Sequence, residues 1–189
     1  MASIIKFGSL VMNGEVCPFP TLRDGKDFWL GDTAEKHQIH WLVVDNKLVC
    51  CWNLITRLSW EELEAGRWAS GKPVFLDGFS FGCRLLQQSD DGSYEWDRAM
   101  EACGGDNAAF HWRNCPSWTR EKRSDESWAG LACGGEKSVE PYITAGWRPV
   151  LVPLGQDSPH DEFLPGWDLL VWGSNFVLDG VLQEQSQYD

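Results

Sequence analysis

Basic residues are scarce in this sequence. Of its 189 residues, 16 are Lys or Arg and 28 are Asp or Glu, so the formal net charge is −12. The basic residues also stop at Arg148, whereas seven acidic residues follow Gly155. Because nucleic acids and anionic membranes are bound mainly through basic surfaces, this composition argues against direct nucleic-acid binding. We expect the acidic end of the chain to be exposed to water.

Long apolar runs are missing as well. No segment is apolar over the roughly 20 residues that a membrane helix needs, so we expect no membrane association. The first residues, MASIIKFGSLVMNGEVC, lack the continuous apolar core of a secretory signal. We therefore expect a protein that is made in the cytoplasm.

Cysteine spacing gives no sign of a metal site or a disulfide scaffold. The seven Cys residues are an odd number, and no two are spaced as Cys-x-x-Cys. Cysteines of cytosolic proteins are mostly reduced and often buried, so we expect seven free thiols. His37 and His40 have the spacing of half a zinc site, but the second ligand pair is missing. We expect neither a metal nor a cofactor.

Turn signals and β-rich runs are abundant. Asp45-Asn46 and Asp77-Gly78 each separate two such runs and are typical of tight hairpin turns. We therefore predict hairpins at 41–52 and 73–86. The run WRPVLVP at 147–153 is apolar on both faces, which predicts a central strand.

Two short helices are predicted. Ser59 and Glu62 have the spacing of a capping box, which predicts a helix at about 59–66. A second helix is predicted at 93–103, because apolar residues recur there every three or four positions. Its buried face is predicted to hold Trp96, Ala99, Met100 and Cys103. Its solvent face is predicted to hold Glu95, Asp97, Arg98 and Glu101.

The pattern divides the chain into three parts. Residues 1–40 are predicted to be an irregular segment packed on the main domain, because prolines and glycines interrupt their short apolar pieces. Residues 41–154 form the predicted main domain. Residues 155–189 are predicted to be an acidic C-terminal extension with a β-hairpin at 167–183.

The stretch 105–146 has no sustained period of either helix or strand. It is rich in Gly, Ser, Asn, Trp and charged residues. Trp and Arg are enriched in interface hot spots, while Ser, Gly and Asn suit adaptable recognition loops. We expect Trp112 and Trp118 to be mostly buried and the rest of this stretch to form long ordered loops.

The order of short motifs carries a resemblance to a known family. FLDGFSFGCRLL is followed by Glu95-Trp96-Asp97, by His111-Trp112, by Ser117-Trp118, by a Gly-rich segment and by Gly-Trp-Arg-Pro ending at Pro149. Over about residues 40–154 this order resembles the C-type-lectin-fold proteins of phages and prophages. The resemblance is to the branch related to formylglycine-generating enzymes, which includes the variable proteins of diversity-generating retroelements. It implies an α+β, C-type lectin-like fold with two short helices, short antiparallel strands and long ordered loops.

Alternatives with other chemistry lack their motifs. A lectin-type calcium site needs EPN-like and WND-like segments, but Tyr142 follows Glu140-Pro141 and no WND occurs. His111 and Cys115 have the residue types of a base and a nucleophile, although Pro116 argues against a helix shared by the two. We expect no catalytic residue. An enzyme of the formylglycine-generating lineage remains as a third interpretation.

The leading interpretation is a non-enzymatic recognition protein of a phage or prophage-like element. It is expected to bind a protein or surface glycan through the loops at 119–142, and to be made in the cytoplasm of a bacterial host. Association with a virion or with a second copy of the chain is left open. The alternative is an acidic cytosolic inhibitor of a nucleic-acid-guided host defence protein. The expected binding residues are Arg120, Arg123, Trp128, Lys137, Glu140 and Tyr142.

Overall fold

The computed structural model consists mostly of β-sheet with two short helices, which confirms the predicted α+β class. Neither helix of the described part has the length and apolar character to cross a membrane. For Lys122 and for 130–133 only the backbone is described. The structure describes residues 3–23, 27–89, 91–113, 115–122, 130–133 and 145–154.

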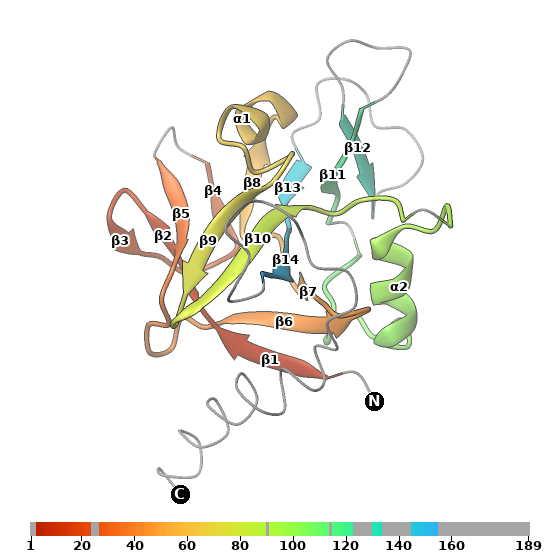
Figure 1. Ribbon diagram of the computed structural model, residues 1–189, viewed down its shortest axis with the longest axis horizontal. Helices are drawn as coiled ribbons and strands as arrows, with labels where there is room; N and C mark the ends of the chain where they lie inside the picture. Colours follow the sequence, from red (N-terminus) through yellow and green to blue (C-terminus); the bar gives the residue numbers. More distant parts are fainter. Residues whose placement is uncertain are drawn as a thin grey trace, which may run out of the picture.

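A six-stranded antiparallel sheet forms the largest layer (Figure 1). Both predicted hairpins belong to it and are confirmed. The first turns at Asp45 and Asn46, which have φ angles of 46° and 59°, and the second turns at Asp77 and Gly78, with φ angles of 49° and 85°. The strands, in their order across the sheet, are β1 (Ile4–Phe7), β6 (Ile39–Val44), β7 (Lys47–Cys50), β14 (Pro149–Pro153), β10 (Phe79–Leu85) and β9 (Lys72–Leu76).

Strand β14 has a central position. It pairs with β7 on one side and with β10 on the other, and the side chains of Val150 and Leu151 are fully buried. The prediction of a central strand is therefore confirmed. Arg148 separates β14 from the short strand β13 (Ala145–Trp147).

Two smaller sheets flank the large one. One has the order β12 (Gly130–Cys133), β11 (Ser117–Lys122), β13, β8 (Ile55–Leu58) and β4 (Thr21–Leu22). The other has the order β3 (Glu15–Val16), β2 (Ser9–Met12) and β5 (Phe28–Gly31).

The prediction that the N-terminal segment is irregular is wrong. Strands β1 to β5 all lie within it, and β1 pairs with β6 in the large sheet. These strands have only two to four residues, which is too short to show a period. Asn13-Gly14, with φ angles of 54° and 86°, turns the chain between β2 and β3. This dipeptide is a strong hairpin signal that could have revealed the pair.

Helix α1 (Trp60–Ala65) begins as predicted. The Ser59 side chain accepts a hydrogen bond from the backbone of Glu62, whose carboxylate in turn accepts one from the backbone of Ser59. Both buried side chains of this helix, Trp60 and Leu63, face the core.

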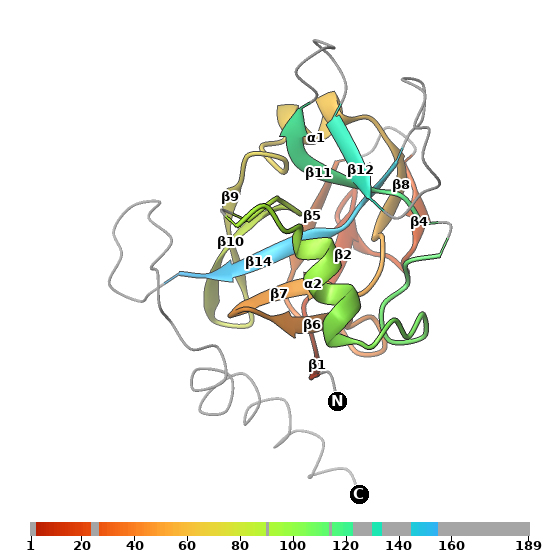
Figure 2. The ribbon, with the colours of Figure 1, turned by 90° about the vertical axis from the view of Figure 1, so that its right-hand side faces the viewer.

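Helix α2 (Glu95–Ala102) buries Trp96 and Ala99 as predicted, and Met100 and Cys103 are partly buried. It lies against the face of the large sheet (Figure 2), where Trp96 packs in a cluster that includes Leu42 of β6. The prediction that Glu95 faces solvent is wrong, because its side chain is buried.

A second cluster of buried side chains fills the space between the three sheets. It includes Trp41, Trp147 and Phe81, all fully buried. Trp118 is buried as predicted, whereas Trp112 is only partly buried. The predicted C-terminal extension and its hairpin lie outside the described residues.

Candidate recognition surface

One of the six expected binding residues, Arg120, lies within the described part of the chain. Its side chain is exposed on β11. Its backbone N–H donates to the carbonyl oxygen of Leu86 over 2.7 Å, and its Nη1 donates to Oε1 of Gln87 over 3.2 Å. The other five, Arg123, Trp128, Lys137, Glu140 and Tyr142, lie outside the described residues.

Strands β11, β12 and β13 are the attachment points of the two segments that carry those five residues. Strand β11 pairs antiparallel with β12 from Ser117 opposite Cys133 to Lys122 opposite Gly130. It also pairs in parallel with β13 at Gly146 (Figure 1). Segment 123–129 therefore joins β11 to β12, and segment 134–144 joins β12 to β13. Both segments begin and end on three neighbouring strands, which we call the recognition base.

The indole groups of two tryptophans form hydrogen bonds between the recognition base and the rest of the molecule. The indole N–H of Trp118 in β11 donates to the carbonyl oxygen of Leu58 over 2.7 Å. The indole N–H of Trp60 in α1 donates to the carbonyl oxygen of Thr119 over 3.0 Å. Both bonds are buried, so each indole fills the core and also fixes the path of β11.

Arg148 lies fully buried directly beneath the recognition base. Its Nε donates to Oγ of Ser117 over 3.0 Å, at the start of β11. Its Nη1 donates to the carbonyl oxygens of Cys50 and Cys51, over 3.1 and 2.8 Å, and its Nη2 donates to the carbonyl oxygen of His111. Burial lowers the pKa of Arg148, but a guanidinium stays charged in proteins.

Aromatic rings complete the surroundings of this guanidinium. The Phe110 ring centroid lies 4.4 Å from the guanidinium carbon, and the Trp96 centroid lies 5.1 Å away. Carbonyl oxygens and aromatic faces thus replace the water that the charge loses on burial. One side chain connects α2, β7 and β11, which makes Arg148 the central positioning residue of the recognition base.

Asn53 continues the hydrogen bonds from Arg148. The hydroxyl of Ser117 donates to Oδ1 of Asn53 over 2.7 Å, and Nδ2 of Asn53 donates to the carbonyl oxygen of Pro116 over 3.0 Å and to Sγ of Cys115 over 3.2 Å. A Cβ atom at Gly146 would lie 2.1 Å from Nδ2 of Asn53. Only glycine therefore allows β13 to pass this close to the amide.

The structure gives His111 and Cys115, the alternative base and nucleophile, separate partners. The His111 ring stacks on Trp52, with 3.7 Å between ring centroids. The Cys115 thiol accepts its hydrogen bond from Asn53 instead. For the residues described, the structure shows no hydrogen bond between the His111 ring and the Cys115 thiol. A search of the same residues finds no group of three metal-ligating side chains.

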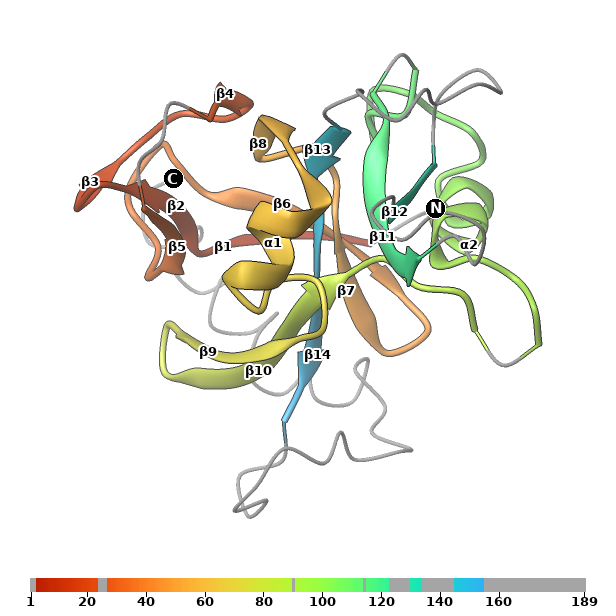
Figure 3. The same cartoon turned by 90° about the horizontal axis from the view of Figure 1, so that it is seen from above.

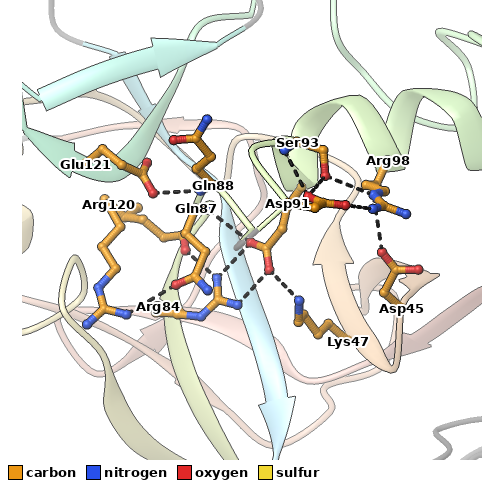
Figure 4. Close-up of polar contacts among 12 residues, drawn as sticks. Asp45, Lys47, Arg84, Gln87, Gln88, Asp91, Ser93, Arg98, Arg120 and Glu121 are labelled. Carbon is orange, nitrogen blue, oxygen red and sulfur yellow. Dashed lines mark hydrogen bonds and ion pairs between the residues drawn. The ribbon is translucent and has the colours of Figure 1, made fainter.

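A buried ion cluster supports the other side of the recognition base. Arg84 makes a bidentate pair with Glu95, with Nη1–Oε2 and Nη2–Oε1 distances of 2.8 and 2.7 Å. Nζ of Lys47 lies 2.9 Å from Oε1 of the same carboxylate. Figure 4 labels Arg84 and Lys47, whose charged ends lie near each other. Burial alone raises the pKa of Glu95, but the hydrogen bonds and charges of Arg84 and Lys47 outweigh it and hold the pKa below its usual value.

The ion cluster reaches the surface through two glutamines. The backbone N–H of Gln87 donates to Oε2 of Glu95 over 3.0 Å, while the Gln87 side chain accepts from Arg120. The backbone N–H of Gln88 donates to Oε1 of Glu121 over 2.6 Å. Figure 4 shows these contacts running from the cluster to β11. Arg120 is therefore connected to the ion cluster through Gln87.

We expect the six cysteines whose side chains are described to react in two groups. All six are free, and burial raises the pKa of Cys50 and of Cys83 to about 12 and also raises that of Cys51. Because the thiolate is the nucleophile, iodoacetamide at pH 8 should label these three only when the protein unfolds. The half-buried Cys17, Cys103 and Cys115 should react first, as followed by mass spectrometry.

Denaturant supplies the control for this labelling. Without a reductant, the unfolded chain should take up seven labels, one for each cysteine. Fewer than seven would contradict the expectation of free thiols. Equal labelling rates for all cysteines in the folded protein would contradict the burial of Cys50, Cys51 and Cys83.

Sequence reasoning did not single out Arg148, Asn53 or Glu95 as parts of a site. One signal was present for Arg148: it is the last basic residue and lies in an otherwise apolar run. Asn53 had no such signal, because its partners are more than 60 residues away.

Comparison of the chain with protein-family models, with curated proteins and with solved structures gives no match.

Proposed function

We propose that this chain is a non-enzymatic recognition protein with a C-type lectin-like fold, which binds a protein or surface glycan through the segments at 123–129 and 134–144. The observation that carries the proposal is the recognition base. Both segments are attached to strands that Arg148, Asn53 and two buried indoles hold in place. Binding residues are disproportionately found on loops that a rigid scaffold positions.

The residue types of the two segments support the same proposal. Trp128, Tyr142 and Arg123 belong to the types that dominate interface hot spots. Arg120 adds an exposed cation on β11, the strand from which the first segment continues. We assign the protein to a phage or prophage-like element in a bacterial host, on the motif order given above.

Truncation of the two aromatic residues tests this function. Trp128→Ala and Tyr142→Ala should each weaken binding about 30-fold, since an anchor residue contributes on the order of 2 kcal/mol. The melting temperature should stay unchanged. Binding is measured first on an array of bacterial surface glycans and purified host proteins, then by calorimetry with the ligand so found. Trp29→Ala is the matched control, because Trp29 is 41% exposed on β5, in another sheet.

Salt dependence separates this function from the acidic-inhibitor alternative, which the net charge of −12 motivates. Docking by aromatic anchors should change little between about 50 and 500 mM salt, whereas a charge mimic should weaken steeply. A lower melting temperature with unchanged binding would place Trp128 and Tyr142 in the core and refute the proposal. Loss of binding only on charge reversal within 157–189 would favour the inhibitor.

A further inference from the structure

A separate cavity lies at the other end of β14. It has a volume of about 230 Å³, is partly open to solvent, and is lined by the turn after α1, the first residues of β9, and Gly82 of β10. Leu154, directly after β14, closes one side. Figure 3 shows the turn after α1 next to the β9–β10 hairpin. Arg148 and Leu154 are six residues apart, or about 20 Å along an extended strand, so the cavity is distinct from the recognition base.

Two cations line this cavity, Arg67 and Lys72, and Ser70 adds a hydroxyl. None of the described residues that line it is acidic. The protein has a net charge of −12, so the local charge of this concave site is opposite in sign to the net charge. We call it the cationic pocket.

The positive charges of the two side chains repel each other. Burial is the main cause that lowers the pKa of Lys72, and the positive charge of Arg67 lowers it further. The Lys72 ammonium lies 3.7 Å from the Trp68 ring centroid and 3.5 Å from the carbonyl oxygen of Gly66. Neither group neutralises its charge. Within the described part of the chain, Arg67 is exposed and forms no side-chain hydrogen bond or ion pair.

The backbone around the cations is fixed before any ligand arrives. Arg67 has a left-handed φ of 60°, and its N–H donates to the carbonyl oxygen of Glu64 over 2.9 Å. Gly71, with φ of 118°, donates to the carbonyl oxygen of Arg67 over 3.1 Å. Trp68 packs against Trp147 in the core, with 4.8 Å between ring centroids and the two rings tilted by 54°. This preorganisation reduces the entropy that binding would otherwise cost.

We propose that the cationic pocket binds the phosphate group of a small organic phosphate. Two positive charges match a phosphate dianion, whereas a single carboxylate would leave one charge uncompensated. The guanidinium fork suits phosphate geometry, and the lysine acts as a point charge. Gly82 adds no side chain to the cavity. The volume is below that of typical drug-sized sites, so the phosphate end of the ligand enters and the remainder stays outside.

Titration of the full chain with inorganic phosphate tests this proposal. Binding is followed by ³¹P NMR and calorimetry at constant ionic strength, with sulfate and acetate as comparison ions. Arg67→Gln and Lys72→Gln should each weaken phosphate binding about tenfold or more, because each removes a charge-assisted contact. Acetate should bind more weakly than either dianion.

The matched control is Arg57→Gln. Arg57 is also exposed, also has φ of 60°, and lies outside the pocket on β8. The Arg57→Gln variant should bind phosphate with an affinity within twofold of that of the unaltered protein. Equal weakening by Arg57→Gln and Arg67→Gln would reduce the effect to general surface charge and overturn the proposal. Absence of saturable binding, or equal binding of acetate, would also overturn it. If Lys72→Gln lowers the melting temperature, the phosphate affinity of Arg67→Gln still decides the test, because Arg67 is exposed.

Discussion

Replacing Arg148 by methionine is expected to lower the free energy of unfolding by about 4 kcal/mol. Methionine fills a similar volume but donates no hydrogen bond, so the carbonyl oxygens of Cys50, Cys51 and His111 lose their bonds to this side chain. The carbonyl oxygen of Cys51 keeps the hydrogen bond that it accepts from the backbone N–H of His111. Each buried polar group left without a partner costs about 1–3 kcal/mol. For a chain of this length the melting temperature should fall by roughly 10 °C. Urea denaturation at 25 °C measures the change.

Two variants sharpen this prediction. Arg148→Lys keeps the charge but has no planar fork, so it should recover only part of the loss. Arg57→Met changes an exposed arginine and should stay within about 0.5 kcal/mol of the unaltered protein. Amide hydrogen exchange at 117–122 should accelerate in Arg148→Met, because Ser117 loses its bond to the guanidinium. Unchanged stability and exchange would show that Arg148 does not hold the recognition base.

Replacing Glu95 by alanine is expected to destabilise the protein by about 3–5 kcal/mol, the usual cost of breaking a buried ion pair. Lys47 can turn toward solvent, since its side chain is 26% exposed, but Arg84 is only 4% exposed and would stay buried without its carboxylate. Glu95→Gln should cost less, because its amide oxygen still accepts a hydrogen bond from the guanidinium.

Acid should weaken the same cluster. The pKa of Glu95 is lower in the folded protein than in the unfolded chain, so its contribution to stability is complete above the unfolded value of about 4.3. That contribution is lost as the pH falls through the folded pKa. Glu95→Gln should therefore show a shallower loss of unfolding free energy between about pH 5 and pH 3.

Glu101→Gln is the matched control for this pH dependence. Glu101 lies on the same helix but is exposed. It should keep the full pH dependence of the unaltered protein. A slope in Glu95→Gln equal to that of Glu101→Gln would contradict the role assigned to the buried carboxylate.

Local sequence alone determined several elements. Asp45-Asn46 and Asp77-Gly78 accept the positive φ angles of tight hairpins, and Ser59 with Glu62 forms a capping box within four residues. The apolar run at 150–152 fixed the central place of β14. In the two turns and the capping box the interacting groups lie within a few residues, so pattern and structure coincide, whereas β14 takes its place by pairing with β7 and β10. Arg120 could be proposed as a binding residue from its residue type, and the structure shows that its side chain is exposed.

Tertiary structure alone decided the burial of charge and the pairing of the shortest strands. The helix pattern predicts that Glu95 faces solvent. Its side chain is buried because Arg84 and Lys47 approach it from two strands and make burial favourable. Arg148 connects several segments only because Cys50, His111 and Ser117, which are distant in the sequence, accept hydrogen bonds from its side chain. Strands as short as β3 and β4 exist only through their partners. Such contacts depend on long-range packing, which a local sequence period of two or 3.6 residues does not predict.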